Sequence, residues 1–269
     1  KDDSLSKLAD KYLGNLLAYP AIVELTNQKA ATDASYAKIL NPNLIEPGWT
    51  DTPGELLVEF RDDITAFDGG KKDVLSRKGS YNAQVSATIF RLLEEKGVPT
   101  HFIRMAGDSA MVVRELRMVP LEVIVRNVAA GSMVRNYPID EGTVLDPPVL
   151  VIDYKDDSRH DPMLNDDLIL ALKILTRGEL EKVRELALGV NEVLKTFFAS
   201  RGITLVDFKI EVGRDGSALL VGDEISMDSM RLWDTATGES LDKDVYRFSK
   251  GDVLEVYRKV VERAGMKGA

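Results

Sequence analysis

The chain has 269 residues, 44% of them hydrophobic, which is enough for one large domain or two modest ones with an ordinary packed core. No apolar run approaches the roughly 18 residues that a membrane span needs. A formal net charge of -9 argues against a nucleic-acid surface, although it leaves room for a local group of arginines that binds a small phosphorylated ligand. The absence of cysteine excludes disulfides, thiolate catalysis and cysteine-ligated zinc, and it is compatible with the cytoplasm.

The first 45 residues carry the weakest pattern. Leu5, Leu8, Tyr12 and Leu16 recur at helical spacing, which predicts an amphipathic helix. Prolines and glycines between residues 42 and 54 predict a loop, and residues 55–60, ELLVEF, predict a strand. The next segment, RDDITAFDGGKK, is too polar and glycine-rich for a core, so it is either a solvated loop or a loop that contacts substrate.

A helix is predicted to begin near Lys78, with apolar side chains at 85, 89, 92 and 93 on one face. Strands follow at residues 110–114 and 121–125. The second strand ends in Arg126, and small residues lead from there to Ser132. Such a turn can place a guanidinium group, a hydroxyl and backbone amides around an anion, although a surface arginine after a strand is the plainer alternative.

Beyond this turn, we expect a connecting loop at residues 137–148, a strand at 149–154 and an acidic loop at 155–161. Helices are predicted near residues 168–175 and 179–200, and a last one over 243–264. His101 and His160 are the two histidines of the sequence, and we expect each to form hydrogen bonds rather than to bind metal, because they lack metal-ligand spacing. Strands grouped in two blocks, without regular βαβ alternation, favour an α+β fold.

Residues 205–224 carry the strongest chemical pattern. Alternation places Asp207, Lys209 and Glu211 on one face of a strand, and turn residues 213–216 lead into a second apolar strand that ends at Asp223. A solvated sheet face is the plain interpretation. Crowded carboxylates repel each other unless a cation lies between them, so Asp207, Glu211 and Asp223 are also candidate ligands of Mg²⁺.

Several segments together resemble the SAICAR synthetase family. They are collinear, and they are FRDDITAFDGGKK at residues 60–72, GVPTHFIR at 97–104, MVPLEVIVRNVAAGS at 118–132, KDDSRHDPMLNDD at 155–167, and LVDFKIEVG, GDEIS, RLWD and LDKDVYR after residue 205. The resemblance implies a ligase of purine biosynthesis that uses ATP and Mg²⁺ to join L-aspartate to the carboxylate of carboxyaminoimidazole ribotide. It also implies a cytoplasmic homodimer with small-molecule substrates and neither nucleic acid nor membrane as a partner.

The same resemblance implies an α+β fold of two domains. A smaller nucleotide domain with an antiparallel sheet would cover residues 1–117, and a larger mixed domain would cover 118–269. Met118 would lie at the hinge against the adenine base. A methionine at such a position is otherwise ordinary core filler.

Site residues follow from the resemblance and from the strand pattern. We expect Glu211 and Asp223 to bind Mg²⁺ and the nucleotide, Asp207 to bind metal near the reacting carboxylate, and Lys209 to neutralise charge there. Asp207, Lys209 and Arg126 form the expected catalytic set. The expected substrate-binding residues are Arg126, Ser132, Lys155, Asp161, Asp228, Arg231 and Arg247.

The N-terminal region departs from the family pattern. Related synthetases carry a Gly-Lys-x-Lys turn over the ATP phosphates, but no glycine occurs here between Gly14 and Gly48. Lys29 and Lys38 are the candidate replacements. We expect this segment to be rebuilt and to contribute less to phosphate binding. Two alternatives stay open: a non-catalytic nucleotide-binding homologue, and a ligase of the same fold that acts on another carboxylate.

Overall fold

The computed structural model describes residues 52–66 and 70–265. The chain divides into two compact units, Lys1–Leu57 and Val58–Ala269. The helix predicted over residues 5–16, and the candidate phosphate-binding residues Lys29 and Lys38, lie outside the described residues.

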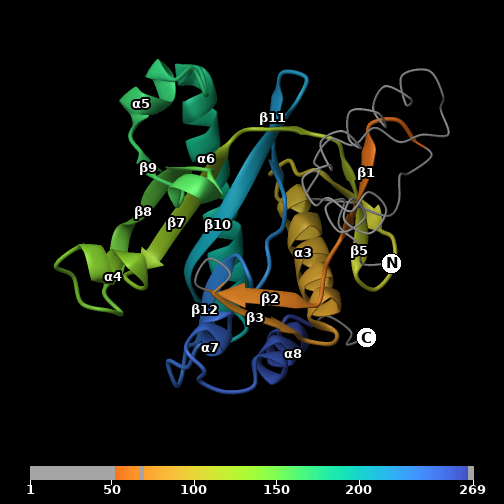
Figure 1. Ribbon diagram of the computed structural model, residues 1–269, viewed down its shortest axis with the longest axis vertical. Coiled ribbons are helices and arrows are strands. Elements are labelled where there is room, and N and C mark those ends of the chain that lie inside the picture. The colour runs from red at the N-terminus through yellow and green to blue at the C-terminus, as the bar shows by residue number, and fades with distance from the viewer. Residues whose placement is uncertain (1–51, 67–69, 266–269) are drawn as a thin grey trace, which may run out of the picture. The chain divides into compact units, whose positions relative to one another are not determined.

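The largest sheet of the described part has seven strands. Its main path has the order β11-β10-β7-β8-β9, and β12 and β6 also pair with β10 (Figure 1). The strands are β6 (Arg117–Met118), β7 (Leu121–Val128), β8 (Val144–Tyr154), β9 (Met163–Leu164), β10 (Ile203–Asp215), β11 (Ala218–Gly222) and β12 (Met230–Asp234).

Strand β10 is the centre of this sheet, because it pairs antiparallel with β7, β12, β11 and β6 along its length. Its register places Asp207 directly opposite Arg126 of β7 and Arg231 of β12. The predicted strand and hairpin are therefore present. The turn is shorter than expected, since β10 continues through Gly213 to Asp215. A Cβ on Gly213 would meet the Leu116 Cβ at 2.6 Å, so glycine permits the close approach of the neighbouring chain here.

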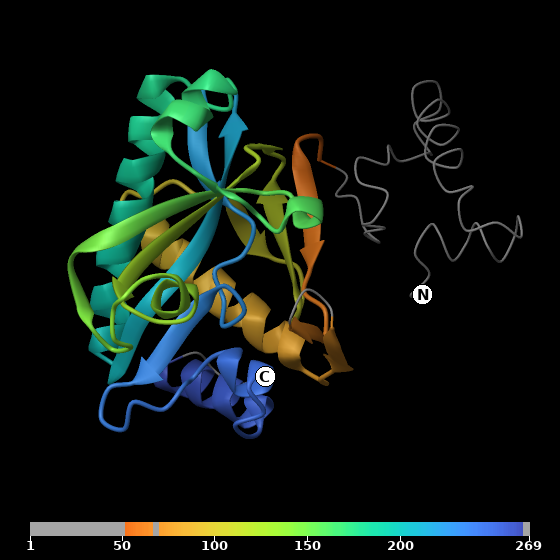
Figure 2. The same ribbon diagram turned by 60° about the vertical axis from the view of Figure 1, so that its left-hand side comes forward.

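The two faces of the sheet differ in chemistry. Leu121, Val123 and Val125 of β7 are fully buried, whereas the alternate positions carry Glu122, Ile124 and Arg126. Helix α6 (Arg177–Ala199) packs against β7 and β10 (Figure 2). Its buried residues are Leu180, Val183, Leu186, Ala187, Val190, Asn191, Leu194 and Phe198. Leu188 of the same helix falls outside this stripe and is 41% exposed.

A second layer is built on α3 (Lys78–Glu95), which packs against α6, α8 and the smaller sheet. That three-stranded sheet has the order β1-β5-β4, formed by β1 (Glu55–Glu59), β5 (Ala110–Arg114) and β4 (Phe102–Met105). Glycine is required at the start of α3, because a Cβ on Gly79 would lie 2.2 Å from the carbonyl oxygen of Phe60. The remaining helices of the described part are α4 (Ser132–Asn136), α5 (Asp166–Ala171), α7 (Asp244–Arg247) and α8 (Val253–Arg263), with a 3-10 turn, η2, at Asp157–Arg159.

Three predicted elements differ from the structure. The polar RDDITAFDGGKK segment is a hairpin of β2 (Asp63–Ala66) and β3 (Lys71–Val74) around the undescribed residues 67–69. The predicted loop at 137–148 ends early, because β8 begins at Val144. The predicted last helix is broken into α7 and α8, because Ser249 and Gly251 have positive φ angles that end α7.

The fold is α+β, as the sequence predicts. Its smaller sheet uses residues before Met118 and its larger sheet uses residues from Arg117 onward, whereas the division of the chain into two compact units falls between Leu57 and Val58. The proposed domain boundary at Met118 therefore stays a prediction. None of the described helices is both long and apolar enough to cross a membrane.

Candidate active site

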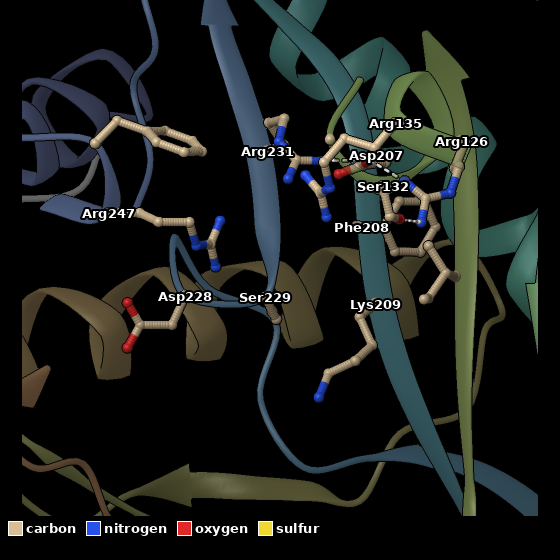
Figure 3. Close-up of a pocket in the computed structure, with 13 residues that line it drawn as sticks. Arg126, Ser132, Arg135, Asp207, Phe208, Lys209, Asp228, Ser229, Arg231 and Arg247 are labelled. Carbon is tan, nitrogen blue, oxygen red and sulfur yellow. Dashed lines mark hydrogen bonds and ion pairs between the residues drawn. The ribbon is translucent and has the colours of Figure 1, made fainter. Parts of the chain in front are cut away.

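A cavity of about 690 Å³ opens on the face of the large sheet that carries Ile124 and Arg126. We call it the arginine pocket. Its lining residues come from β7, α4, β10, β12, α7 and adjoining loops, and Figure 3 draws them: Ile124, Arg126, Gly131, Ser132, Arg135, Asp207, Phe208, Lys209, Asp228, Ser229, Arg231, Arg247 and Phe248. The pocket therefore gathers most of the residues that were expected to contact substrate, from segments more than 100 positions apart.

Asp207 organises one wall of the pocket. Its Oδ2 accepts hydrogen bonds from the Arg126 guanidinium at 2.9 Å and from the Arg231 guanidinium at 2.6 Å. These contacts follow from the register, because both arginines lie directly opposite Asp207 on neighbouring strands. Burial raises the pKa of Asp207, and the two guanidinium groups oppose that shift. Asp207 thus holds two planar donors in fixed orientations at the pocket wall.

The loop after β7 lets these guanidinium groups approach the backbone. Gly131 has φ 59°, and a Cβ built on it would lie 2.8 Å from a nitrogen of Arg231. The next residue, Ser132, accepts a hydrogen bond from Arg126 at 3.1 Å. The small residues of this turn therefore leave space for Arg231 and place a hydroxyl beside Arg126.

A second carboxylate, Asp244, extends the network to α7. It accepts a hydrogen bond from Arg231 Nε at 2.8 Å and also pairs with Arg247. Burial disfavours the charged form of Arg231, but Asp207 and Asp244 raise its pKa. Three arginines, Arg126, Arg231 and Arg247, thus share two carboxylates, which leaves an excess positive charge for an anionic ligand.

Glu211 and Asp223 form a separate group, which we call the carboxylate pair. Glu211 lies opposite Gly222 across the hairpin, so Asp223 follows directly beside it. Burial and the charge of Asp223 raise the pKa of Glu211, while ion pairs with Lys155 and Lys209 oppose the shift. The hairpin therefore delivers two carboxylates to one place, as expected.

Lys209 lies between the two groups. It lines the arginine pocket, pairs with Glu122, and has its Nζ 3.9 Å from the Glu211 carboxylate. Burial lowers the pKa of Lys209, but Glu122 and Glu211 outweigh this and raise it. The ammonium group is therefore a permanent positive charge at the junction of the arginine pocket and the carboxylate pair.

The three expected metal ligands, Asp207, Glu211 and Asp223, do not lie in one cluster. Asp207 and Glu211 are four residues apart on one strand, which separates their Cα atoms by about 13 Å. The Asp207 carboxylate is held by two arginines, and within the described part of the chain no three acidic or histidine side chains lie close enough to bind one metal ion. The structure therefore leaves Glu211 and Asp223 as candidate ligands and gives Asp207 a different environment.

The other expected residues lie outside the arginine pocket. Met118 is 40% exposed and packs over Gly213 and Gly222 of the hairpin. Lys155 pairs with Glu211, which places it at the carboxylate pair. Asp161 accepts a hydrogen bond from the backbone N–H of Asp156 at 2.8 Å, so it organises the loop after β8.

Comparison with known proteins matches this arrangement to one family. A sequence profile described as SAICAR synthetase matches residues 49–264. Phosphoribosylaminoimidazole-succinocarboxamide synthase of Methanoregula boonei is 67% identical over 214 residues, covering 80% of this chain and 84% of that protein. The enzyme of the same name from Methanosarcina mazei is 54% identical, with 80% and 90% of the chains covered. The chain belongs to the SAICAR synthetase family.

Solved structures agree with this membership. A SAICAR synthetase of Pyrococcus horikoshii has a TM-score of 0.78 and 49% identity, covering 80% of this chain and 95% of that one. A SAICAR synthetase in complex with ADP has the same TM-score and 48% identity, covering 80% and 93%. The SAICAR synthetase match begins at residue 49, so the atypical N-terminal segment before it lies outside the matched region.

Several residues of the site were not expected from sequence. Arg135, Phe208 and Phe248 line the pocket, while Glu122 and Asp244 pair with its cations. The sequence does contain a pattern that points to Glu122 and Asp244. Glu122 falls on the same face of β7 as Arg126, and Asp244 lies in the LDKDVYR segment. No such pattern pointed to Phe208, since strict alternation places it on the opposite face from Asp207. Strand β10 is irregular between Leu205 and Asp207, where its pairing with β12 shifts.

Proposed function

We propose that the chain catalyses the reaction of its family, in which ATP drives amide formation between L-aspartate and the carboxylate of carboxyaminoimidazole ribotide. The products are SAICAR, ADP and phosphate, within purine biosynthesis. One observation carries this proposal: Lys209 joins a pocket suited to anions and a carboxylate pair suited to a metal-bound nucleotide. A phosphoryl group passing between the two would meet a fixed positive charge there.

The reaction needs ATP because a free carboxylate is a poor acyl donor, since its leaving group would be oxide. Transfer of the terminal phosphoryl group of ATP to a carboxylate oxygen gives an acyl phosphate and ADP. The aspartate amine then attacks the acyl carbon, the C–O bond to phosphate breaks, and the amine loses a proton as the amide forms. The protein mainly positions the reactants and neutralises charge.

The arginine pocket fits the ribotide, which carries a phosphate and a carboxylate. Arg126, Arg231 and Arg247 present planar donors that match such anions, and Ser132 adds a hydroxyl beside Arg126. In this proposal, Asp207 keeps the forks of Arg126 and Arg231 aimed at the ligand rather than binding metal itself.

Asp228 is the proposed contact for the aspartate amine. It is the pocket carboxylate whose cationic partner, Lys78, does not line the pocket, in contrast to Asp207 with its two pocket arginines. An amine donates hydrogen bonds, so a fixed acceptor is the group that recognises it.

Glu211 and Asp223 would hold Mg²⁺ and the nucleotide phosphates, with Lys155 and Asp161 as flanking contacts and Met118 against the adenine. The pair fits the ion, because Mg²⁺ takes one or two protein carboxylates and fills its other positions with water and phosphate oxygens. The repulsion by which Asp223 raises the pKa of Glu211 would be relieved by a cation. When bound, the ion would neutralise charge on the phosphates.

A direct assay tests the proposal. The protein is incubated with ATP, Mg²⁺, L-aspartate and the ribotide, and ADP and the amide product are measured, with each component omitted in turn. We expect ADP and SAICAR in equal amounts, dependent on all components. Nucleotide binding without ADP release would support a non-catalytic homologue instead. ADP release with a different carboxylate but not with the ribotide would identify a ligase of another pathway.

We also infer a cytoplasmic homodimer, which is the assembly and compartment that the family resemblance implies. Its phosphorylated substrates are membrane-impermeant and are held inside cells, which supports the compartment. Light scattering coupled to gel filtration tests the assembly, and a mass of twice 29.8 kDa is expected.

A further inference from the structure

Tyr257 of α8 reaches the arginine pocket without lining it. Its side chain is fully buried, and its hydroxyl donates a hydrogen bond to Asp228 Oδ1 at 2.6 Å. The other oxygen, Oδ2, pairs with Lys78 at the start of α3, at 2.7 Å. Each oxygen of Asp228 is thus held by one donor, and the two donors come from two different helices.

Neither donor, Lys78 or Tyr257, lines the arginine pocket, whereas Asp228 does. The Asp228 side chain is 13% exposed, against 6% for Lys78. A carboxylate oxygen has two lone pairs, so each oxygen can still accept a second hydrogen bond from a ligand. The clamp therefore fixes the plane of the carboxylate, and each of its oxygens keeps a lone pair for a further donor.

The chemistry of Tyr257 suits a permanent donor. Burial and the charge of Asp228 raise its pKa well above the ordinary value, so the hydroxyl keeps its proton throughout the working pH range. A buried hydroxyl without a partner is costly, which favours the bonded arrangement. With Lys78 alone, the Asp228 carboxylate would keep one of its two donors.

We propose that Tyr257 is a positioning residue, which holds Asp228 in the orientation that receives the amine of the aspartate substrate. The proposal rests on the proposed function, because it takes Asp228 as the contact for that amine. It adds a role for α8, a helix that contributes no residue to the pocket lining.

Tyr257→Phe tests the proposal, because it removes one oxygen and keeps the buried ring. We expect kcat/KM for aspartate to fall by about tenfold or more, the size typical of a lost hydrogen bond to a charged group, while KM for ATP changes less than about twofold. Tyr246→Phe is the matched control. Its hydroxyl donates to Asp73 at 2.8 Å, away from the pocket lining, so it removes a similar bond at a different place.

A kinetic double-mutant cycle with Asp228→Asn separates positioning from a structural role. If Tyr257 acts through Asp228, Tyr257→Phe will lower kcat/KM for aspartate much less in the Asp228→Asn background. An equal loss in both backgrounds, or a loss no larger than that of Tyr246→Phe, would overturn the positioning role. Unchanged aspartate kinetics in Asp228→Asn alone would instead refute the amine contact assumed under the proposed function.

Folding of the variant is checked by Mg²⁺-ADP binding in a calorimeter, because the proposed function assigns that binding to Glu211 and Asp223 and not to Asp228. A second variant, Lys78→Gln, removes the other half of the clamp. We expect it also to raise KM for aspartate more than KM for ATP. Equal effects of Lys78→Gln on both substrates would count against the clamp, whatever the behaviour of Tyr257→Phe.

Discussion

Arg126 shows how one residue combines several constraints. It lies opposite Asp207 in the sheet, bonds to that carboxylate at 2.9 Å and to Ser132 at 3.1 Å, and still lines the arginine pocket. These contacts use the planar, forked donors of a guanidinium group. A lysine would keep the charge but could not bond both partners and a ligand from fixed directions.

Arg126→Lys should therefore raise KM for the ribotide by about tenfold or more and leave KM for ATP within about twofold. Steady-state kinetics with each substrate varied in turn measure this. Arg258→Lys is the control, since Arg258 is an exposed residue of α8 that pairs with Glu262. Similar increases in both constants would mean that Arg126 supports the fold and does not bind the ribotide.

At the scale of elements, the start of α6 connects the helix to the sheet. Thr176 and Glu179 form a reciprocal capping box, and Glu179 also accepts a hydrogen bond from Arg214 of β10 at 2.7 Å. Bonds from Arg214 and the Thr176 backbone lower the pKa of Glu179 to about 2. The cap thus fixes both the first turn of α6 and its place against β10.

We expect Thr176→Ala to destabilise the fold by about 1 kcal/mol, because it removes an N-cap acceptor and leaves backbone N–H groups of the first turn without a protein partner. Urea unfolding measures the change, and activity per folded molecule should stay the same. Thr196→Ala, the same substitution at an exposed site within α6, should have little effect, because alanine favours helix interiors. Equal losses in the two variants would show that the capping contribution is negligible.

The elements also show what the sequence could predict. Regular patterns predicted β10, α3, α6 and the hairpin, because each buries a continuous stripe or alternate positions. Breaks in a pattern were missed. The positive φ angle of Ser249 divides the last predicted helix, and the pairing of β10 with β12 shifts between Leu205 and Asp207. Such features depend on tertiary packing rather than on local preference.

In the site, too, local patterns predicted some features, and others depend on tertiary packing. The sequence pattern placed Asp207 and Glu211 on one face, but it could not show that Arg126 and Arg231 would both bond to Asp207. That outcome depends on which strands flank β10, which is a property of the whole sheet. Lys78 and Tyr257, which hold Asp228, belong to helices whose packing no local pattern predicts.

Stability of the whole molecule should depend on pH through His101. Its side chain is 4% exposed, its ring packs on Phe90, and it lies where the smaller sheet meets the hairpin strand β11. Burial lowers its pKa to about 4, although Asp223 opposes the shift. A histidine that is buried in its neutral form must be protonated at a cost when the pH falls, which favours the unfolded chain.

Proton binding by the unfolded chain determines the direction in which stability changes with pH. Between pH 6.5 and about 4 the unfolded chain binds the proton and the folded protein does not, so stability falls as the pH falls through this window. Each pKa unit is about 1.4 kcal/mol, so the full loss is on the order of 3 kcal/mol. Urea unfolding without Mg²⁺ or nucleotide should show a weaker pH dependence in His101→Phe than in the parent. His160→Asn, at an exposed histidine, should retain the parent's dependence.

The ATP phosphates could be held by the segment before Gly48 or by the carboxylate pair with its metal ion. The region before Gly48 has no glycine after Gly14, so it lacks residues that freely adopt positive φ angles for a backbone phosphate cradle. The carboxylate pair, by contrast, is positioned by the pairing of β10 with β11. We therefore expect the metal and the larger unit to supply most of the affinity for the nucleotide.

Glu211→Ala should weaken Mg²⁺-ADP binding by at least tenfold in calorimetry, while Lys29→Ala and Lys38→Ala should each weaken it by less than about threefold. The fold should tolerate Glu211→Ala, because its loss removes repulsion with Asp223 and leaves Lys155 with a side chain that is already 44% exposed. Lys182→Ala, at an exposed lysine of α6, sets the baseline for the loss of one surface charge. A loss in either N-terminal lysine variant as large as that in Glu211→Ala would mean that the segment before Gly48 binds the phosphates despite its missing glycines.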